Sequence, residues 1–342
     1  MREVAAVFLR LGLIGFGGPV AHLALMEEEV VERRRWLTRE HFLDLVGLTN
    51  LIPGPNSTEM AIHLGYLRAG WRGLLVGGLC FLLPAVAITT AVAWLYQVYG
   101  TLAPARAAFR GIEPSVIAVI GVAAWRLGST AVTNVPHAIF GAVLVAAVLL
   151  GLDPVLALFA GIALGTPISR RALCVPLGPL FLVFLKIGAV LYGSGYVLVA
   201  FLEDELVARG WVTHGELLDA VAVGQVTPGP VLSTATFLGN RLGGAWGAML
   251  ATLGIFLPSF VFVAALGPLA AKLRVTSWAT PFLAAVRVTS LALLVAVLVQ
   301  LSKGLDLRGA AIAVLALAAG VGFKVAPHWL ILGGAVLGFL LW

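Results

Sequence analysis

Asn50-Leu-Ile-Pro53-Gly54-Pro55 interrupts an apolar stretch over residues 41–68, and Gln225-Val-Thr-Pro228-Gly229-Pro230 interrupts a second one over residues 216–241. Proline lacks an amide donor and clashes with the preceding helical turn, and it drives the residue before it out of the helical region. Each stretch is therefore predicted to break at its middle. The arms have about 12 residues and rise only about 18 Å, too little to cross a hydrocarbon core of about 30 Å. A re-entrant hairpin fits these lengths.

The two interrupted stretches belong to a longer internal repeat. Residues 8–12 (Phe-Leu-Arg-Leu-Gly) recur as residues 184–188 (Phe-Leu-Lys-Ile-Gly), and residues 81–84 (Phe-Leu-Leu-Pro) recur as residues 255–258 (Ile-Phe-Leu-Pro). Repeats of this size in an apolar chain are typical of secondary transporters, whose sites lie where the two copies meet.

The composition of the chain indicates whether the two repeats lie in water or in a membrane. Hydrophobic residues make up 61% of the chain and charged residues 11%, against roughly 45–50% and about 25% in soluble domains. We therefore expect an all-α polytopic membrane protein with a first repeat over 1–175 and a second over 176–342. The long apolar runs lie near 4–26, 73–96, 111–128, 134–150, 152–168, 179–201, 246–267, 281–301, 309–323 and 327–342.

The topology depends on whether each interrupted stretch crosses the membrane. With re-entrant hairpins each repeat has about five crossings, an odd number, so the second repeat is inverted and the chain has 5+5 spans. If each stretch crosses as one kinked helix, both repeats have six crossings and are parallel. We favour the inverted arrangement. The basic residues of the first repeat then mark the cytoplasmic side.

The breaks expose groups suited to binding an anion. Backbone groups freed from helical pairing are tolerated at membrane depth only where protein buries them or where water fills a cavity. A helix N-terminus also offers unpaired amides and about half a positive charge. The alternative is that Pro-Gly-Pro is only a tight turn. The candidate binding residues at the breaks are Asn50, Pro53, Gly54, Pro55, Asn56, Ser57, Thr58, Gln225, Thr227, Pro228, Gly229, Pro230 and Ser233.

Arg10 and Lys186 occupy matching positions in apolar sequence, each shortly before a glycine cluster. A charge inside a membrane marks a functional site by default, although one near a helix end can extend to the headgroups. The glycines are expected to break the helix and to expose further amides. Gly17, Gly18, Gly193 and Ser194 are the candidates from these clusters.

Three acids are candidates for carrying a coupling proton. Glu59 lies one turn after the first Pro-Gly-Pro, and Thr234 takes its place in the second repeat. Asp44 and Asp219 precede the two breaks at matching positions, where each could relay protons or cap a hairpin arm.

Other titratable residues are expected to have different roles. Glu27, Glu28 and Glu29 follow Arg10 by about 17 residues, or about 25 Å of continuous helix, which predicts that they lie on the opposite membrane face. His22 and His63 could titrate, but a single histidine on an apolar helix is more often a hydrogen-bonded structural residue.

Together these motifs resemble the chromate ion transporter family, in the long form that fuses both halves. The resemblance covers nearly the whole chain, and it implies a multi-pass inner-membrane carrier that exports chromate with the proton-motive force. It leaves sulfate or another oxyanion open, and a passive anion channel is a further alternative. The motifs that carry it are Phe16-Gly17-Gly18-Pro19, Trp36-Leu-Thr38, residues 50–57, Gly70-Trp71-Arg72-Gly73, Phe81-Leu-Leu-Pro84, residues 225–230 and Phe256-Leu-Pro258-Ser259.

Several function classes have no support in the sequence. No G-x-x-x-x-G-K-[ST] loop occurs, which excludes a self-contained ATP-driven pump. Cys80 and Cys174 have no partners suited to a metal site or to redox catalysis, so we expect neither an enzyme nor a metal or other cofactor. The net charge of +6 is scattered over short loops, which indicates membrane topology and not nucleic-acid binding. The expected partners are the oxyanion and the lipid bilayer, and a homodimer remains open.

Overall fold

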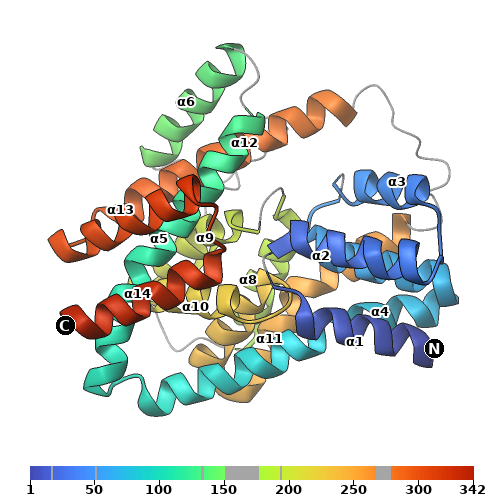
Figure 1. Cartoon of the computed structure of the whole chain (residues 1–342), viewed down its shortest axis with the longest axis horizontal. Coiled ribbons are helices and arrows are strands. Elements are labelled where there is room, and N and C mark those ends of the chain that lie inside the picture. The colour runs from blue at the N-terminus through green and yellow to red at the C-terminus, as the bar shows by residue number, and fades with distance from the viewer. Residues whose placement is uncertain (17, 51, 132–134, 151–176, 193–194, 267–278) are drawn as a thin grey trace. The chain divides into compact units, whose positions relative to one another are not determined.

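The computed structural model describes residues 1–342 except 17, 51, 132–134, 151–176, 193–194 and 267–278. The described residues form helices joined by turns, as the composition predicts (Figure 1). The chain divides into two compact units, and each unit contains segments of both repeats. Unit 1 comprises Met1–Ala93, Pro176–Gly195 and Thr227–Leu283, and unit 2 comprises Trp94–Val175, Tyr196–Val226 and Ala284–Trp342.

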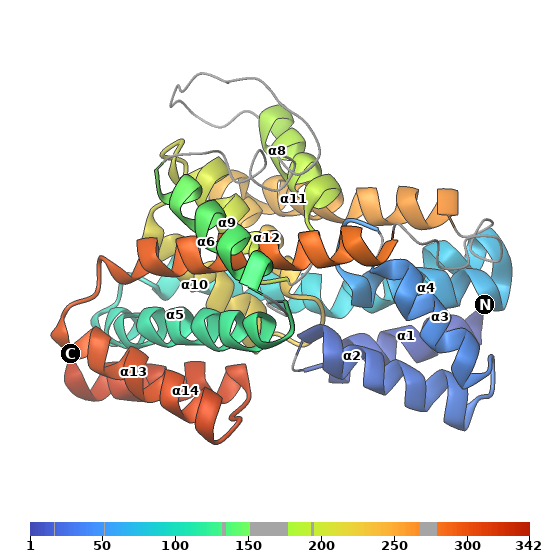
Figure 2. The ribbon, with the colours of Figure 1, turned by 90° about the horizontal axis from the view of Figure 1, so that it is seen from above.

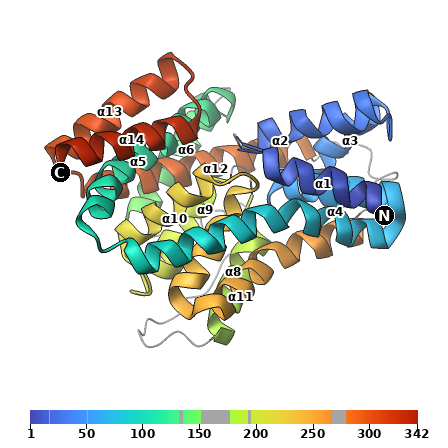
Figure 3. The same cartoon turned by 60° about the horizontal axis from the view of Figure 1, so that its bottom comes forward.

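Unit 1 contains the early helices of the first repeat and two helical segments of the second. In chain order its elements are α1 (Arg2–Ile14), α2 (Gly18–Glu27), the π-helical turn η1 (Glu28–Arg33), α3 (Arg39–Thr49), α4 (Asn56–Tyr99, which leaves the unit after Ala93), α8 (Leu177–Val190), the 3₁₀ turn η3 (Val231–Ser233) and α11 (Thr234–Leu266). Helices α8 and α11 pack side by side (Figure 3).

The first apolar run is not one helix. Helix α1 ends at Ile14 and α2 begins at Gly18, and in the second repeat α8 ends at Val190 and α9 begins only at Val197. The prediction that the glycine clusters break the helix is confirmed. The apolar run over residues 4–26 therefore contains two helices, because the Gly-Phe-Gly-Gly-Pro sequence ends α1.

Helices α4 and α11 each reverse direction at a glycine. Gly70 has φ 61° and Gly244 has φ 59°, in the left-handed region that favours glycine. A Cβ added at Gly73 would collide with the carbonyl oxygen of Gly65, although residues eight apart on one continuous helix would be separated by about 12 Å. Each helix is therefore a short arm packed tightly against a long one.

The core of unit 1 joins α1, α2, α3 and α4. Phe8, Met26, Phe42, Met60 and Phe81 are fully or almost fully buried in it. Burial of such side chains stabilises the packing by about 1.5–3 kcal/mol each. This core fixes the position of the segment between α3 and α4.

Unit 2 is built around α5 (Ala103–Ala131). Helices α13 (Leu307–Gly322) and α14 (Pro327–Leu341) pack along α5 (Figure 2), and α10 (His214–Val226) packs against both α5 and α14. A Cβ at Gly111 would collide with the backbone of Gly334, so glycine allows α5 and α14 to approach closely. The remaining elements are α6 (Val135–Leu149), α9 (Val197–Leu202), the π-helical turn η2 (Glu203–Val207) and α12 (Ala279–Ser302), of which α12 begins before the boundary of the unit.

By length and composition, four helices among the described residues could cross a membrane. They are Asn56–Tyr99, Ala103–Ser129, Val231–Ala265 and Ala285–Ser302, with shorter apolar helices at Ala138–Leu149, Leu177–Val190, Leu307–Gly322 and Pro327–Leu341.

Candidate functional site

The first Pro-Gly-Pro lies between α3 and α4, where residues 50 and 52–55 are described and are not part of either helix; we call residues 50–55 the first break. Helix α3 ends at Thr49 and α4 begins at Asn56, as the prolines predict. Gly54 has φ 138°, which only glycine adopts readily. The side chain of Asn56 donates a hydrogen bond to Oδ1 of Asn50, and this bond links the two ends of the break.

Helix α4 starts with backbone groups available at the first break. The amides of Thr58 and Glu59 donate to the carbonyl oxygen of Pro55 at 2.8 Å and 3.1 Å. The preceding amides, on Asn56 and Ser57, have no carbonyl partner within the helix. The predicted amide-rich helix start is therefore present.

The second break, residues 227–230, has the same construction. Helix α10 ends at Val226 and η3 begins at Val231. Gly229 has φ 103°, and the amide of Ser233 donates to the carbonyl oxygen of Pro230 at 3.0 Å.

Each break is held by the opposite repeat. The amide of Gly54 donates to the carbonyl oxygen of Leu191 at 2.6 Å, and the amide of Gly229 donates to that of Gly15 at 2.7 Å. Gly15 and Leu191 occupy matching positions, just past α1 and α8. The two hydrogen bonds are therefore equivalent, and they give unit 1 a local two-fold pseudosymmetry.

A buried carboxyl group lies against the first break. Glu59 is 0% exposed. A Cβ at Gly54 would collide with Oε1 of Glu59 and would lie 2.6 Å from the hydroxyl of Ser259, on α11. Neither carboxyl oxygen makes a hydrogen bond of regular geometry to a described residue, and the hydroxyl of Ser259 lies beside them. An acid from one repeat and a hydroxyl from the other thus face the same glycine.

The second break has no such acid. At the position of Ser259 it has Ala85, whose methyl group would lie 2.7 Å from a Cβ at Gly229. At the position of Glu59 it has Thr234, whose hydroxyl donates to the carbonyl oxygen of Val231 at 2.8 Å. Of the two glycines, only Gly54 therefore faces a carboxyl group among the described residues.

Other buried polar side chains of unit 1 lack partners among the described residues. They are Thr58 and His63 on α4, Thr89 further along the same helix, and Ser233 at the second break. Leaving such a group unsatisfied costs about 1–3 kcal/mol of stability. Each of these groups therefore indicates a position where a ligand, an ion or water can bind.

The two histidines differ. His22 has its Nε2 2.9 Å from the carbonyl oxygen of Gly15, the oxygen that also accepts from Gly229, so its structural role is confirmed. For His63 the described residues do not show the hydrogen bond expected of a structural histidine. His63 is 0% exposed and neither ring nitrogen has a hydrogen-bond partner in the described part of the chain.

Arg10 and Lys186 have different surroundings. The side chain of Arg10 is 57% exposed, and its guanidinium lies 3.8 Å from Oε2 of Glu29. The prediction that Glu27 to Glu29 lie on the face opposite Arg10 is therefore wrong for Glu29. The reason is that the helix is not continuous: after the glycine cluster the chain turns back along α2. Lys186 is half-buried on α8.

The remaining sequence candidates are divided between the two units. Asp44 is exposed on α3. Asp219 and Gln225 belong to unit 2, where Asp219 is buried and accepts a hydrogen bond from the hydroxyl of Tyr96 at 2.7 Å, and Gln225 accepts one from Tyr196 at 3.3 Å. Gly18 begins α2. Gly17, Gly193 and Ser194 lie outside the described residues.

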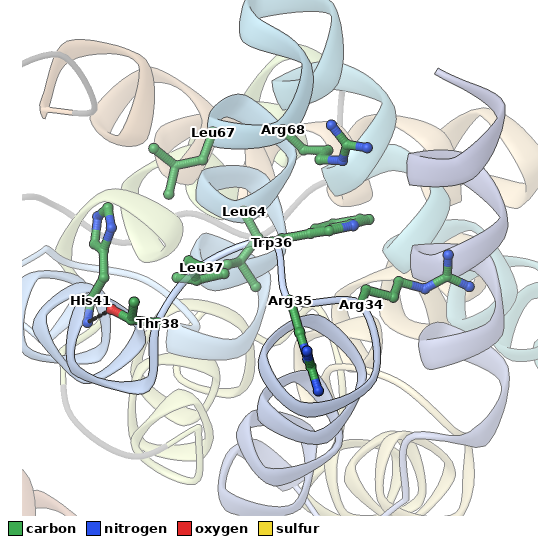
Figure 4. Close-up of a pocket in the computed structure, with 9 residues that line it drawn as sticks. All are labelled: Arg34, Arg35, Trp36, Leu37, Thr38, His41, Leu64, Leu67 and Arg68. Carbon is green, nitrogen blue, oxygen red and sulfur yellow. Dashed lines mark hydrogen bonds between the residues drawn. The ribbon is translucent and has the colours of Figure 1, made fainter.

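A cavity of about 610 Å³ lies near the start of α3 in unit 1 (Figure 4). Thr38 caps α3 by accepting a hydrogen bond from the amide of His41 at 3.3 Å. Arg34 donates to Glu29 at 2.8 Å and to Glu3 at 3.1 Å, and the bond to Glu29 raises the pKa of Arg34 above its ordinary value, so this side chain stays charged. The lining residues are Arg34, Arg35, Trp36, Leu37, Thr38, His41, Leu64, Leu67 and Arg68.

Comparison with known proteins connects this arrangement to a family. The profile of the family described as "Chromate transporter" matches residues 2–166 and 178–339. A "Chromate transport protein" of Cupriavidus metallidurans is 30% identical and the match covers 98% of this chain and 92% of that protein. One of Pseudomonas aeruginosa is 32% identical over 76% and 71%, and a "Probable chromate transport protein" of Synechococcus elongatus is 31% identical over 76% and 74%. No solved structure matches the chain significantly.

Proposed function

Because the chain belongs to the chromate transporter family, in its long two-copy form, we propose that it carries chromate, or a related tetrahedral oxyanion, as a secondary transporter. The family is one of integral membrane transporters. One observation carries the proposal: the first break combines an unpaired helix start with a buried acid that has no regular hydrogen bond.

The first break supplies donors for an oxyanion. The amides of Asn56 and Ser57, the side chain of Asn56 and the hydroxyl of Thr58 lie at the start of α4. Helix starts bind phosphate-like anions through such amides and through the helix dipole. Chromate has the size and charge for these donors, and sulfate does as well. The site therefore selects an anion class, and substrate identity is left to experiment.

Glu59 couples anion binding to a proton. A carboxylate next to a dianion is disfavoured by like charge, so the pair binds most favourably when Glu59 is protonated. The anion and the proton are then carried together, and the complex moves one net negative charge. A membrane potential that is negative inside drives such a charge outward by about 2.3 kcal/mol per 100 mV. The electrical part of the proton-motive force thus powers export from the cell across its inner membrane.

Two inverted repeats of five spans are the proposed topology. The equivalent hydrogen bonds of Gly54 and Gly229 support a two-fold relation between the repeats, and the odd number of crossings makes that relation an inversion. Single cysteines beside Arg34 and Arg209, in a protein without Cys80 and Cys174, are expected to react with an impermeant reagent from opposite sides. Equal labelling of both from one side contradicts the inversion.

The transport proposal is tested with purified protein in liposomes. Uptake of chromate, sulfate and molybdate is measured with an imposed potential, with an imposed pH gradient, and with neither. We expect saturable chromate flux that follows the potential and moves protons in the same direction. Flux without saturation and without proton movement would instead identify a passive channel.

A further inference from the structure

We propose that the cavity near the start of α3 is the mouth of a proton path, and that His41 and His63 carry protons from it to Glu59. The inference rests on the proposed coupling at Glu59. It assigns a role to one cavity and to two histidines.

The cavity lies close to Glu59 along α4. Its wall includes Leu64, which directly follows His63 in the chain. His63 in turn lies four residues after Glu59, a rise of about 6 Å along the helix, and side chains four residues apart share one face. Leu64 lies five residues after Glu59, so the cavity wall and the acid are separated by about one and a half turns along α4.

His41 and His63 connect the cavity to the interior. His41, on α3, is exposed and lines the cavity (Figure 4). His63 is completely buried, yet it lies close enough to His41 for the charges of the two rings to interact. His41 can therefore exchange protons with water, and His63 can take them inward.

The unpaired nitrogens of His63 suit a relay. A structural histidine normally has at least one ring nitrogen hydrogen-bonded, but both nitrogens of His63 lack a partner in the described part of the chain. Imidazole can accept a proton on one nitrogen and release one from the other. A proton from cavity water binds His41, passes to His63, and is released to the carboxylate of Glu59, so no net charge remains on the histidines.

Arg34, Arg35 and Arg68 place positive charge at the mouth of the path. Further groups act on its inner part. His41 on α3 acts on His63, and Tyr192, just past α8, is within electrostatic range of Glu59. Ser259 on α11 contributes only a neutral hydroxyl. No described arginine or lysine forms an ion pair with Glu59, so a proton delivered there is not displaced by a fixed cation.

The second repeat lacks the path. Leu238 occupies the position of His63, and Glu216 occupies that of His41. Glu59 is itself missing there, because Thr234 replaces it. Relay and acid are therefore present in the same repeat and absent from the same repeat, as expected if they act together.

The test uses the full chain in liposomes that contain a pH-sensitive dye. Proton movement during chromate flux is measured beside chromate-for-chromate exchange, which needs no net proton transfer. For His63→Gln we expect proton-coupled flux to fall about tenfold or more while exchange is retained. His41→Gln should also lower proton-coupled flux, because His41 is the exposed ring that takes up protons from cavity water. His328→Gln, a histidine of unit 2, is the matched control and should behave like wild type.

A rescue experiment guards against simple misfolding. In His63→Ala, added imidazole should restore proton movement without changing exchange. If His63→Gln and His63→Ala both move protons at the wild-type rate, the relay is wrong while coupling at Glu59 stands. If wild-type protein moves no protons with chromate, the proposed coupling itself is wrong. If the His63 variants lose both exchange and proton movement, and imidazole restores neither, His63 is needed for folding and the relay role is wrong.

Discussion

The two breaks share a backbone and differ in chemistry. Gly54 and Gly229 both have positive φ, and both donate an amide to a carbonyl oxygen of the opposite repeat. Yet the first break faces Glu59 and Ser259, whereas the second faces Ala85 and a threonine whose hydroxyl is already bonded. The backbone arrangement of the break is present in both repeats, but the buried acid that faces its glycine is present only in the first.

Because of this difference, the two breaks have the same backbone arrangement but not the same chemistry. A charged or protonatable group placed identically in both repeats would give two equivalent sites. With an acid at only one break, the proposed proton coupling is assigned to that break alone. The predictions below change one break at a time and compare it with its counterpart.

The largest effect is expected from Gly54→Ala. Alanine at φ 138° is strained, and its methyl group would collide with the carboxyl of Glu59, so transport should be lost while the protein still inserts. Gly229→Ala should also impair transport, because its methyl would lie 2.7 Å from that of Ala85. Adding Ala85→Gly should partly rescue the second variant. Liposome flux and membrane yield are the measurements, and wild-type flux in Gly54→Ala contradicts the prediction.

Glu59→Gln should abolish proton coupling. The amide cannot take up a proton at neutral pH, so we expect chromate-linked proton movement to fall about a hundredfold, a range typical for removal of a general acid. Chromate exchange should persist. Thr234→Val, at the matching position, should leave coupling intact. Dye-loaded liposomes measure proton movement for both variants. If Glu59→Gln still couples chromate to protons, another acid carries the proton.

Lys186→Gln should weaken substrate binding more than Arg10→Gln. Lys186 is half-buried, where a charge acts through a lower dielectric than in water. Arg10 is exposed and close to Glu29. We expect the apparent substrate constant to rise about tenfold for Lys186→Gln, equal to about 1.4 kcal/mol, and to change little for Arg10→Gln. The apparent substrate constant is obtained from flux at several chromate concentrations. An equal rise in both variants would show that Arg10 and Lys186 contribute equally to substrate binding.

The smallest effect is expected from exchanging the neutral partners. Ser259→Ala removes the hydroxyl beside Glu59, and we expect at most a few-fold loss of coupled flux, because the two side chains are close but make no regular hydrogen bond. Ala85→Ser adds a hydroxyl at the second break, where no acid is present, and should change flux less. If Ala85→Ser has the larger effect, the two breaks are not chemically distinct in the way described.

Much of the local structure could be predicted from the sequence. Proline and glycine act through local sterics, so the ends of α3 and α1 and the start of α4 follow from Pro53 and from the glycine cluster after Ile14. The repeat itself pointed to Glu59, because an acid replaced by threonine in the other copy is visible without coordinates.

Contacts between residues far apart in the chain are harder to predict from the sequence than local structure. Helix length places Glu29 far from Arg10 only if the helix is continuous, and the change of direction at a break cannot be calculated from composition. Nothing in the sequence shows whether a ring nitrogen of His63 has a hydrogen-bond partner. The cavity beside it depends on how α3 and α4 pack, which a linear pattern does not record.

The sequence by itself determined that the chain is a membrane protein, that it contains two repeats and where helices must end. These properties depend on composition and on the sterics of single residues. Only the tertiary structure decided that each break is held by the other repeat, that Ser259 faces Glu59, and that Arg10 lies beside Glu29. Those contacts join residues that are far apart in the chain, and they depend on the packing of whole helices, which no local propensity specifies.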